Sequence, residues 1–261
     1  MKISLIIPSF NRPDLLNIGL WSLSQQKISH DIEILVINDG LLDNTENICK
    51  KYTGKLNIKH IFTGQRHQQD FIHHRCPGFA INIGVKQCKG DIILLSSPEI
   101  FHLNNSIDML IKPLENSDKL ITTPLLVYFD KGNIINFLKQ KLTLNIPKEK
   151  INIMELTKFN FGSVQVPYFI ALYKKHFLEI GGYDEDFIGY ASDDNDLASR
   201  LKKKPLQFHR TNALIIHLYH GKKFNPDTTI TTNPQWMYNY NLYISRCNII
   251  NRNNNREWGK L

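Results

Sequence analysis

Short apolar segments alternate with helical ones over the first hundred residues of the chain. Residues 3–7, 32–37 and 58–62 are apolar runs rich in β-branched side chains, which is typical of buried strands. Residues 91–95 form a fourth run of the same kind. Pro8 follows the first run directly and is expected to end it, because proline has no amide hydrogen to give to a strand ladder.

Helical spacing fills the intervals between these runs. Leu16 and Leu20 fall on one face of a helix that Pro13 is suited to begin. Residues 45–52 and 77–88 are the next two predicted helices. Apolar strands that alternate with helices predict an α/β fold with a mostly parallel sheet, covered by helices on both faces.

Regular patterns are sparser in the second half of the chain. Residues 129–167 are Lys- and Asn-rich, lack a clear period and predict an insertion that faces the substrate. The polar tail at 251–256 is expected to fray. The remaining expected elements are a helix over 104–115, strands over 119–127, 168–173 and 213–217, and helices from 174, from about 193 and over 234–248.

The length and the order of elements point to one domain with one site. A chain of 261 residues with 42% apolar side chains can bury a sizeable core. In parallel sheets, ligands bind beyond the carboxyl ends of the strands. We therefore expect residues 8–12, 38–40 and 96–102 to meet in one crevice of a single Rossmann-type domain that spans residues 1–261.

Charge is unevenly distributed. The formal net charge is +8, yet the chain from Arg200 onward holds 11 basic and 2 acidic residues. A basic end favours an anionic partner, which leaves open a nucleotide phosphate, an acidic glycan, a membrane surface or nucleic acid. The aromatic residues near this end, such as Trp236 and Tyr238, follow a helical apolar pattern, so nucleic acid is not expected.

Cysteine spacing and the chain start limit the class of protein further. The four cysteines form no Cys-x-x-Cys pair, which excludes a zinc ribbon and a dithiol redox motif. The first apolar run is too short for a signal peptide, and no stretch of ~18 apolar residues occurs. We expect a cytoplasmic protein, with peripheral membrane association left open.

Five short motifs follow one another along the chain. They are Pro-Ser-Phe-Asn-Arg at 8–12, Asn-Asp-Gly at 38–40, Lys-Gly-Asp-Ile-Ile-Leu-Leu at 89–95, Gly-Gly-Tyr-Asp-Glu-Asp-Phe at 181–187 and Ser-Asp-Asp-Asn-Asp at 192–196. The first three together resemble family 2 glycosyltransferases with the A-type, nucleotide-sugar-binding fold. The last two resemble a motif of galactosyltransferases and chondroitin-type polymerases. The resemblance implies a nucleotide-sugar-binding half at 1–103 and an acceptor-binding, catalytic half at 104–261.

The resemblance implies a donor site for a UDP-sugar. Asp39 would accept a hydrogen bond from the uracil or the ribose, although Asn-Asp-Gly is also an ordinary turn. Asn82, on an apolar helix, is equally typical of a buried, hydrogen-bonded residue. The further implied donor contacts are Pro8, Ser9, Asn11, Arg12, Arg75, Ser97 and Pro98.

A divalent cation in such enzymes is held by an Asp-x-Asp motif after the fourth strand. Ser97, Pro98 and Glu99 occupy the matching positions, so the first carboxylate is missing. Glu99 keeps the last motif position and offers one hard oxygen ligand. The alternative is that these residues begin a helix, with Glu99 placed favourably on its dipole.

Histidines supply the further candidate ligands. His102 could add a nitrogen ligand or contact the sugar. His220 is favoured over His217, which ends an apolar strand and is typical of an interior histidine, although both remain candidates. Oxygen and nitrogen ligands together suit Mn²⁺ or Mg²⁺, and the imidazoles favour Mn²⁺.

The acidic run at the expected helix start carries the candidate catalytic groups. By the resemblance, Asp194 is the general base that takes a proton from the acceptor hydroxyl, and Asp193 binds a neighbouring acceptor hydroxyl. Asn195 and Asp196 bind the acceptor or only cap the helix, and Asp193 is itself a reasonable N-cap. A single displacement by a base inverts the anomeric configuration.

These expectations favour a metal-assisted, inverting transferase that moves a hexose or N-acetylhexosamine to a glycan or other acceptor, as in polysaccharide biosynthesis. A nucleotidylyltransferase would need a Gly-rich signature near the N-terminus, which residues 8–12 lack. A catalytically inactive glycan- or nucleotide-binding relative is the alternative, with Ser97 as the mark of a lost metal site. Lys222 and Lys223 are further candidates for contact with the diphosphate or an anionic acceptor.

Overall fold

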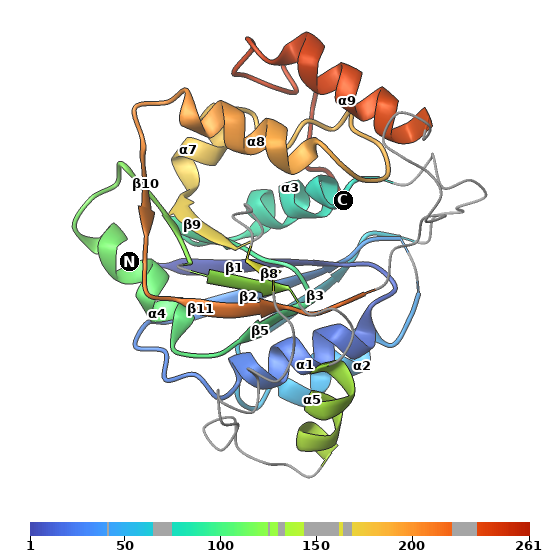
Figure 1. Ribbon diagram of the computed structural model, residues 1–261, viewed down its shortest axis with the longest axis vertical. Coiled ribbons are helices and arrows are strands. Elements are labelled where there is room, and N and C mark those ends of the chain that lie inside the picture. Colours follow the sequence, from blue (N-terminus) through green and yellow to red (C-terminus); the bar gives the residue numbers. More distant parts are fainter. Residues whose placement is uncertain are drawn as a thin grey trace.

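A seven-stranded sheet forms the centre of the computed structural model (Figure 1). Its strands lie in the order β10-β6-β9-β4-β1-β2-β3, and all neighbours are parallel except for the two pairs made by β9. This arrangement confirms the mostly parallel α/β sheet. The bounds are β1 Ile3–Ser9, β2 Ile32–Asn38, β3 Ile58–Phe62, β4 Ile92–Leu95, β6 Leu120–Thr123, β9 Ile170–Tyr173 and β10 Gln207–Arg210.

The structure describes most of the chain, in eight segments. These are residues 1–40, 42–64, 75–124, 126–129, 134–143, 162–163, 169–220 and 234–261. Within them, no helix is long and apolar enough to cross a membrane.

Helices cover both faces of the sheet, as predicted (Figure 1). One face carries α1 (Pro13–Leu23), α2 (Thr45–Tyr52) and α5 (Ile134–Thr143), and the other carries α3 (Pro77–Gln87), α7 (Lys174–Glu179) and α8 (Asp193–Lys202). The last helix, α9 (Pro234–Arg246), packs beyond α8.

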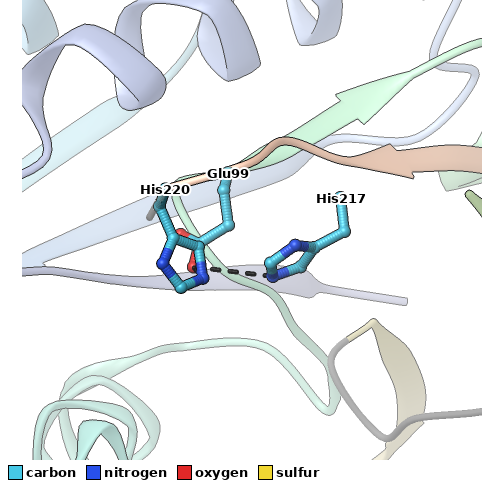
Figure 2. A group of neighbouring side chains, drawn as sticks. All are labelled: Glu99, His217 and His220. Atoms are coloured by element: carbon cyan, nitrogen blue, oxygen red, sulfur yellow. Dashed lines mark ion pairs between the residues drawn. The ribbon is translucent and has the colours of Figure 1, made fainter. Parts of the chain in front are cut away.

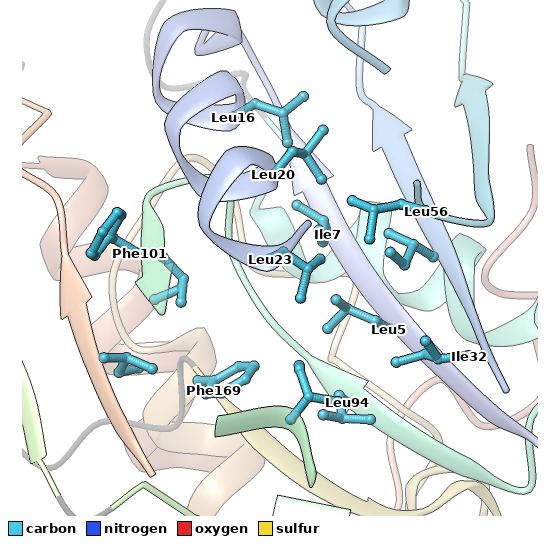
Figure 3. Close-up of a cluster of buried hydrophobic side chains, with 14 of the residues drawn as sticks. Leu5, Ile7, Leu16, Leu20, Leu23, Ile32, Leu56, Leu94, Phe101 and Phe169 are labelled. Atoms are coloured by element: carbon cyan, nitrogen blue, oxygen red, sulfur yellow. The ribbon is translucent and has the colours of Figure 1, made fainter. Parts of the chain in front are cut away.

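Alternation along each strand divides the core into two apolar clusters. Leu5 and Ile7 point toward α1, where they pack with Leu16 and Leu20 (Figure 3), whereas Ile6 belongs to the cluster under α3. All five side chains are at most 5% exposed. Because both faces of β1 are apolar, the strand can lie only in the middle of a covered sheet.

A smaller second sheet corrects the prediction of one strand over 119–127. Residues 120–123 belong to β6, whereas β7 (Leu126–Phe129) lies in a four-stranded sheet of order β5-β11-β7-β8. Pro124 separates the two strands and cannot donate to a ladder. The other strands of this sheet are β5 (Ile100–His102), β8 (Gly162–Ser163) and β11 (Leu214–His217).

Pro8 does not end the first strand, contrary to the prediction. The carbonyl of Ile6 accepts from Ser96 on the β4 side, so Pro8, two residues further on, also directs its nitrogen to that side. The pairing with β4 ends at Ile6 and Leu95, and the pairing with β2 continues to Ser9. The missing amide hydrogen therefore costs no ladder bond.

A proline also shortens the helix predicted over 104–115. The α-helix α4 runs from Ser106 to Ile111, and residues Lys112–Glu115 form a 3₁₀ turn. Pro113 lies at the start of that turn, where its missing amide hydrogen would leave a gap in a continuing α-helix.

The Asn-rich tail does not fray, which corrects the prediction for residues 251–256. Arg252 is 4% exposed, and its Nη2 donates to Asp196 Oδ1 at 2.5 Å. Asn253 Nδ2 donates to the carbonyl of Tyr183 at 2.7 Å. Asparagine and arginine look like solvated residues in the sequence, but here they satisfy buried polar groups of a distant turn.

Candidate active site

The three predicted segments meet where the central strands end. The amide of Asp39 donates to the carbonyl of Ser9 at 2.9 Å, which joins the ends of β2 and β1. The Arg12 side chain, just past β1, forms an ion pair with Glu99, which follows β4. Residues from all three predicted segments therefore meet at one edge of the sheet.

Glu99, His217 and His220 form a cluster at this edge (Figure 2). The Nε2 atoms of both histidines lie 3.6 Å from Glu99 Oε1, and one ligand atom from each residue lies within 4.8 Å of the others. These separations suit ligands that share one cation at bonds of roughly 2.1 Å. The sequence favoured His220 over His217, and the structure brings both to Glu99.

Burial and charge act in opposite directions on these groups. Burial pushes the pKa of Glu99 up, but Arg12 and the two imidazoles push it down, and the net effect lowers it. Burial lowers the pKa of His217, so its imidazole is neutral near pH 7 and suited to be a ligand. Glu99 Oε2 is buried and has no hydrogen-bond partner among the described residues. A carboxylate oxygen in that state fits a cation.

His102 lies outside this cluster. It is 3% exposed, its Nδ1 and Ser106 Oγ are 2.7 Å apart, and its ring packs edge-on against Phe169. These contacts place the side chain in the apolar interior beside Phe169. The expectation that His102 joins the metal ligands or the sugar contacts is therefore not met by this arrangement.

Asp39 lies in a network at the end of β2. Its Oδ1 accepts from Thr63 Oγ1 at 2.7 Å and from Arg75 Nη2. The side chain is 9% exposed. The Arg75 guanidinium lies 4.8 Å above the Phe79 ring, and the Arg75 backbone bridges to Ile188. Arg75 therefore links the proposed donor edge to the segment that precedes α8.

The other predicted donor residues differ in exposure. Pro8 and Ser9 are buried in β1, and Pro98 is buried after β4. Asn11 is exposed and has a φ of 50°, a left-handed conformation that asparagine tolerates better than most residues. Ser97 is partly buried, and its hydroxyl lacks a partner among the described residues.

Asn82 belongs to the interior. It is fully buried, its Nδ2 donates to the Tyr183 carbonyl and to Glu185 Oε1, both at 2.9 Å, and its Oδ1 accepts from the Tyr183 amide at 2.9 Å. Every polar atom of its side chain is used, so it has none to offer a donor substrate. The structure thus agrees with the alternative prediction of a buried, hydrogen-bonded residue. Its hydrogen bonds attach the 181–187 turn to α3.

Asp193 and Asp194 lie in the first turn of α8, as predicted. Burial and the charge of Asp194 raise the pKa of Asp193 to about 8. Burial also raises the pKa of Asp194 to about 6, against a hydrogen bond from Tyr183 that lowers it. Burial and the neighbouring charges of Asp193 and Asp194 raise the pKa of the Cys76 thiol well above its ordinary value. Near pH 7 the pair therefore binds about one proton, and the hydrogen bond from Tyr183 favours Asp194 as the ionised member.

The backbone just before α8 is strained. Ala191 and Ser192 have φ values of 77° and 70°, which cost energy for residues with a Cβ. Two buried amides of α9 hold this loop: Gln235 Nε2 donates to the Tyr190 carbonyl at 2.5 Å, and Asn239 Nδ2 to the Ala191 carbonyl at 3.1 Å. The sequence analysis did not identify Gln235 and Asn239 as residues that support the site. The feature that could have indicated them is two amide side chains spaced i, i+4 on one predicted helix.

Asp196 and Asn195 have surroundings that differ from those of Asp193 and Asp194. Asp196 is 1% exposed, and its carboxylate accepts from Arg200 Nε at 2.7 Å and from Arg252 Nη2 at 2.5 Å. Both oxygens are used in buried ion pairs, so neither is left for an acceptor or for a helix cap. Asn195 is exposed on the first turn of α8, where contact with an acceptor stays a prediction.

Two predicted regions fall mainly outside the described residues. Lys222 and Lys223 lie in the segment 221–233, outside them. Of the insertion at 129–167, the structure describes only Phe129, α5 and β8.

Sequence comparison relates the chain to known enzymes. The profile of glycosyl transferase family 2 matches residues 4–181, and the profile described as the N-terminal domain of galactosyltransferase matches residues 161–223. Chondroitin synthase of Escherichia coli is 24% identical over 243 residues, which cover 82% of this chain and 34% of that protein. Chondroitin synthase of Pasteurella multocida is 28% identical over 232 residues, which cover 77% of this chain and 23% of that protein. The chain thus spans about a third or less of these relatives.

Solved structures support the same fold at low identity. The structure of GalNAc-T7 with UDP, GalNAc and Mn²⁺ has a TM-score of 0.61 at 12% identity and covers 93% of this chain and 48% of that chain. The mannosyltransferase from Pyrobaculum calidifontis with GDP-Man and Mn²⁺ has a TM-score of 0.56 at 13% identity. The match covers 82% of this chain and 56% of that chain. The fold is that of A-type glycosyltransferases. Since the family 2 profile covers more than half of its residues, the chain belongs to glycosyl transferase family 2.

Proposed function

We propose that the chain is an inverting glycosyltransferase that moves a hexose or N-acetylhexosamine from a UDP-sugar to a hydroxyl of a glycan or other acceptor. The observation that carries the proposal is the Asp193–Asp194 pair in the first turn of α8, whose raised pKa values let it share one proton near pH 7, with the Tyr183 hydrogen bond favouring ionised Asp194. An ionised carboxylate with a pKa near 6 is a suitable base for a sugar hydroxyl at neutral pH.

The donor nucleotide would lie over the ends of β1 and β2. Asp39 is the acceptor for the base or the ribose, and Arg75, which already donates to Asp39, holds it in place. Arg12 is at the phosphate side, next to Glu99. The division into a donor half at 1–103 and an acceptor half at 104–261 is part of the proposal. Similar folds solved with UDP support the choice of nucleotide.

Glu99, His217 and His220 would hold a divalent cation, Mn²⁺ or Mg²⁺. Their donor set and the unpartnered Glu99 Oε2 fit such an ion, even though Ser97 replaces the first acid of the usual motif. When bound, the ion neutralises the charge that builds on the leaving diphosphate.

Asp194 would carry out the proton transfer in a single displacement. The acceptor oxygen forms a bond to the anomeric carbon as the bond to the diphosphate breaks, and the hydroxyl proton passes to Asp194. The proton on Asp193 lets that residue donate to a neighbouring acceptor hydroxyl. Because the attack comes opposite the leaving group, an α-linked donor gives a β-linked product.

Calorimetric titration of UDP tests the donor site directly. Binding in Mn²⁺ buffer that is lost in EDTA, with weaker binding of GDP, is the expected result. Incubation with UDP-sugars and glycan acceptors, followed by NMR of the product linkage, tests the rest. A product that keeps the anomeric configuration of the donor would contradict the single displacement.

A second candidate function is favoured by Ser97. The missing first acid suits a catalytically inactive relative that binds a glycan or a nucleotide without transfer. Such a protein would bind UDP or a glycan equally well in EDTA, and would release no UDP from any UDP-sugar.

A further inference from the structure

We propose that Arg12 is a built-in counter-cation of the Glu99–His217–His220 cluster, which holds the cluster closed until a divalent ion displaces it. The inference rests on the metal site proposed above and adds to it a residue that controls how tightly the ion binds. The carbonyl of Arg12 accepts from Leu16 in the first turn of α1, which ties this residue to the start of the helix.

The contacts of the guanidinium occupy the groups that an ion would need. Arg12 Nη1 donates to Glu99 Oε1, the same oxygen that lies 3.6 Å from both imidazole Nε2 atoms. Arg12 Nη2 lies 3.3 Å from His220 Nδ1. The guanidinium therefore contacts two of the three proposed ligands. Because it is positively charged, it repels a divalent cation that approaches the same ligands.

The hydrogen bond to His220 adds a second reason for competition. Arginine can only donate, so His220 Nδ1 must be the acceptor, and the proton of a neutral ring then lies on Nε2. Nε2 is the nitrogen that faces Glu99, and it can bind an ion only without that proton. When Nε2 binds an ion, the proton of the neutral ring must lie on Nδ1. A protonated Nδ1 cannot accept the hydrogen bond from Arg12, so the ion and the Arg12 contact exclude each other.

Burial explains why a counter-cation is needed at all. The Glu99 side chain is 5% exposed, and a buried carboxylate without a partner is costly. Arg12, at 32% exposure, can leave for solvent or for the anionic diphosphate at small cost. Arg12 and the ion thus alternate as partners of Glu99, and the freed guanidinium becomes available to the phosphates as the ion arrives.

The test is the affinity for Mn²⁺ alone, without nucleotide, measured by calorimetry. Arg12→Gln removes the competing charge and should bind Mn²⁺ about tenfold tighter or more. Arg12→Lys keeps a charge there and should stay nearer to the wild-type affinity. Arg210→Gln, an exposed arginine on the outer strand β10, is the matched control and should leave the affinity unchanged.

The outcomes separate this inference from the metal site itself. Mn²⁺ binding that is equal or weaker in Arg12→Gln overturns the role of Arg12 but leaves the site intact. Equal tightening in Arg210→Gln overturns it as well, since the effect would then be one of net charge. Absence of Mn²⁺ binding in every variant contradicts the site and the inference together.

A second measurement covers the case in which Arg12→Gln does not fold. The side-chain ¹⁵N signal of Arg12 in the wild-type chain, assigned by its loss in Arg12→Lys, should shift saturably with Mg²⁺. A signal that saturating Mg²⁺ does not move would overturn the displacement.

Discussion

The hydroxyl of Tyr183 donates to Asp194 Oδ1 at 2.8 Å. Tyr183 is 2% exposed, and its ring lies so close to Gly78 on α3 that any Cβ there would meet it at 2.6 Å. Packing against α3 therefore fixes the position of the tyrosine ring, and its hydroxyl in turn fixes one oxygen of the proposed base. The hydrogen bond stabilises the ionised form of Asp194 and so lowers its pKa, against the effect of burial.

Tyr183→Phe should raise the pKa of Asp194 and move the acidic limb of the pH profile to higher pH. The proposed mechanism requires ionised Asp194, so kcat/KM should rise through about pH 6 in the wild type and later in the variant, with about a tenfold loss at pH 6. Tyr52→Phe is the control, because Tyr52 also loses a buried hydroxyl contact, to Asn17, on the opposite face. An identical pH profile in Tyr183→Phe and wild type would contradict this role.

Asp194→Asn should remove transfer and keep the donor site. We expect kcat to fall about 10²- to 10⁴-fold, because the amide cannot accept the hydroxyl proton. UDP affinity, measured by calorimetry in the same buffer, should change little. A variant that transfers sugar at the wild-type rate would exclude Asp194 as the base.

Stability should fall with rising pH because of the acidic pair. The folded-state pKa values of Asp193 and Asp194 lie above those of an unfolded chain, so the folded state binds more protons between about pH 4 and pH 8. The free energy of unfolding therefore decreases across that window. Asp193→Asn should flatten the decrease and be more stable than wild type at pH 8, by on the order of 1–3 kcal/mol.

Urea unfolding at pH 5, 6, 7 and 8 measures this difference. Asp31→Asn, at an exposed position before β2, is the matched control and should follow the wild-type curve. Parallel curves for Asp193→Asn and wild type would mean that the pair carries no shared proton.

Glu99→Gln should weaken Mn²⁺ binding by about tenfold or more, because it replaces the proposed anionic ligand by a neutral amide. Mn²⁺-dependent UDP binding should fall with it. Glu46→Gln, which alters an exposed pair with Lys50 on α2, serves as the control. Unchanged Mn²⁺ affinity in Glu99→Gln would move the metal site elsewhere.

Asn239→Ala should lower both stability and transfer. The side-chain amide is fully buried and donates to three carbonyls of the loop before α8, at 2.6, 2.8 and 3.1 Å. Without it, the strained Ala191–Ser192 backbone can relax and move the acidic pair. We expect a loss of about 2–4 kcal/mol in unfolding free energy and a lower kcat in the folded fraction. Asn241→Ala, exposed on the same helix, should affect neither quantity.

Local patterns predicted most of the first half of the fold. The helix over 45–52 and the strand over 58–62 match α2 and β3 at both ends. The errors lie at prolines, at short edge strands and in the C-terminal tail. Whether Pro8 ends a strand depends on which neighbour its nitrogen faces, and β10 is exposed along its whole length, so it lacks an apolar pattern.

Periodicity and neighbouring residues were enough to predict the alternating strands and helices of the first hundred residues, the acidic pair at the start of α8 and the acid at position 99. Which groups share a charge or a proton depends on how distant segments pack together. Arg12 and His220 are in contact although 208 positions separate them in the sequence, and Arg12 and Glu99 are in contact across a separation of 87 positions. Burial then sets the protonation of each group, since removal from water is a property of the whole fold and leaves no local trace in the sequence.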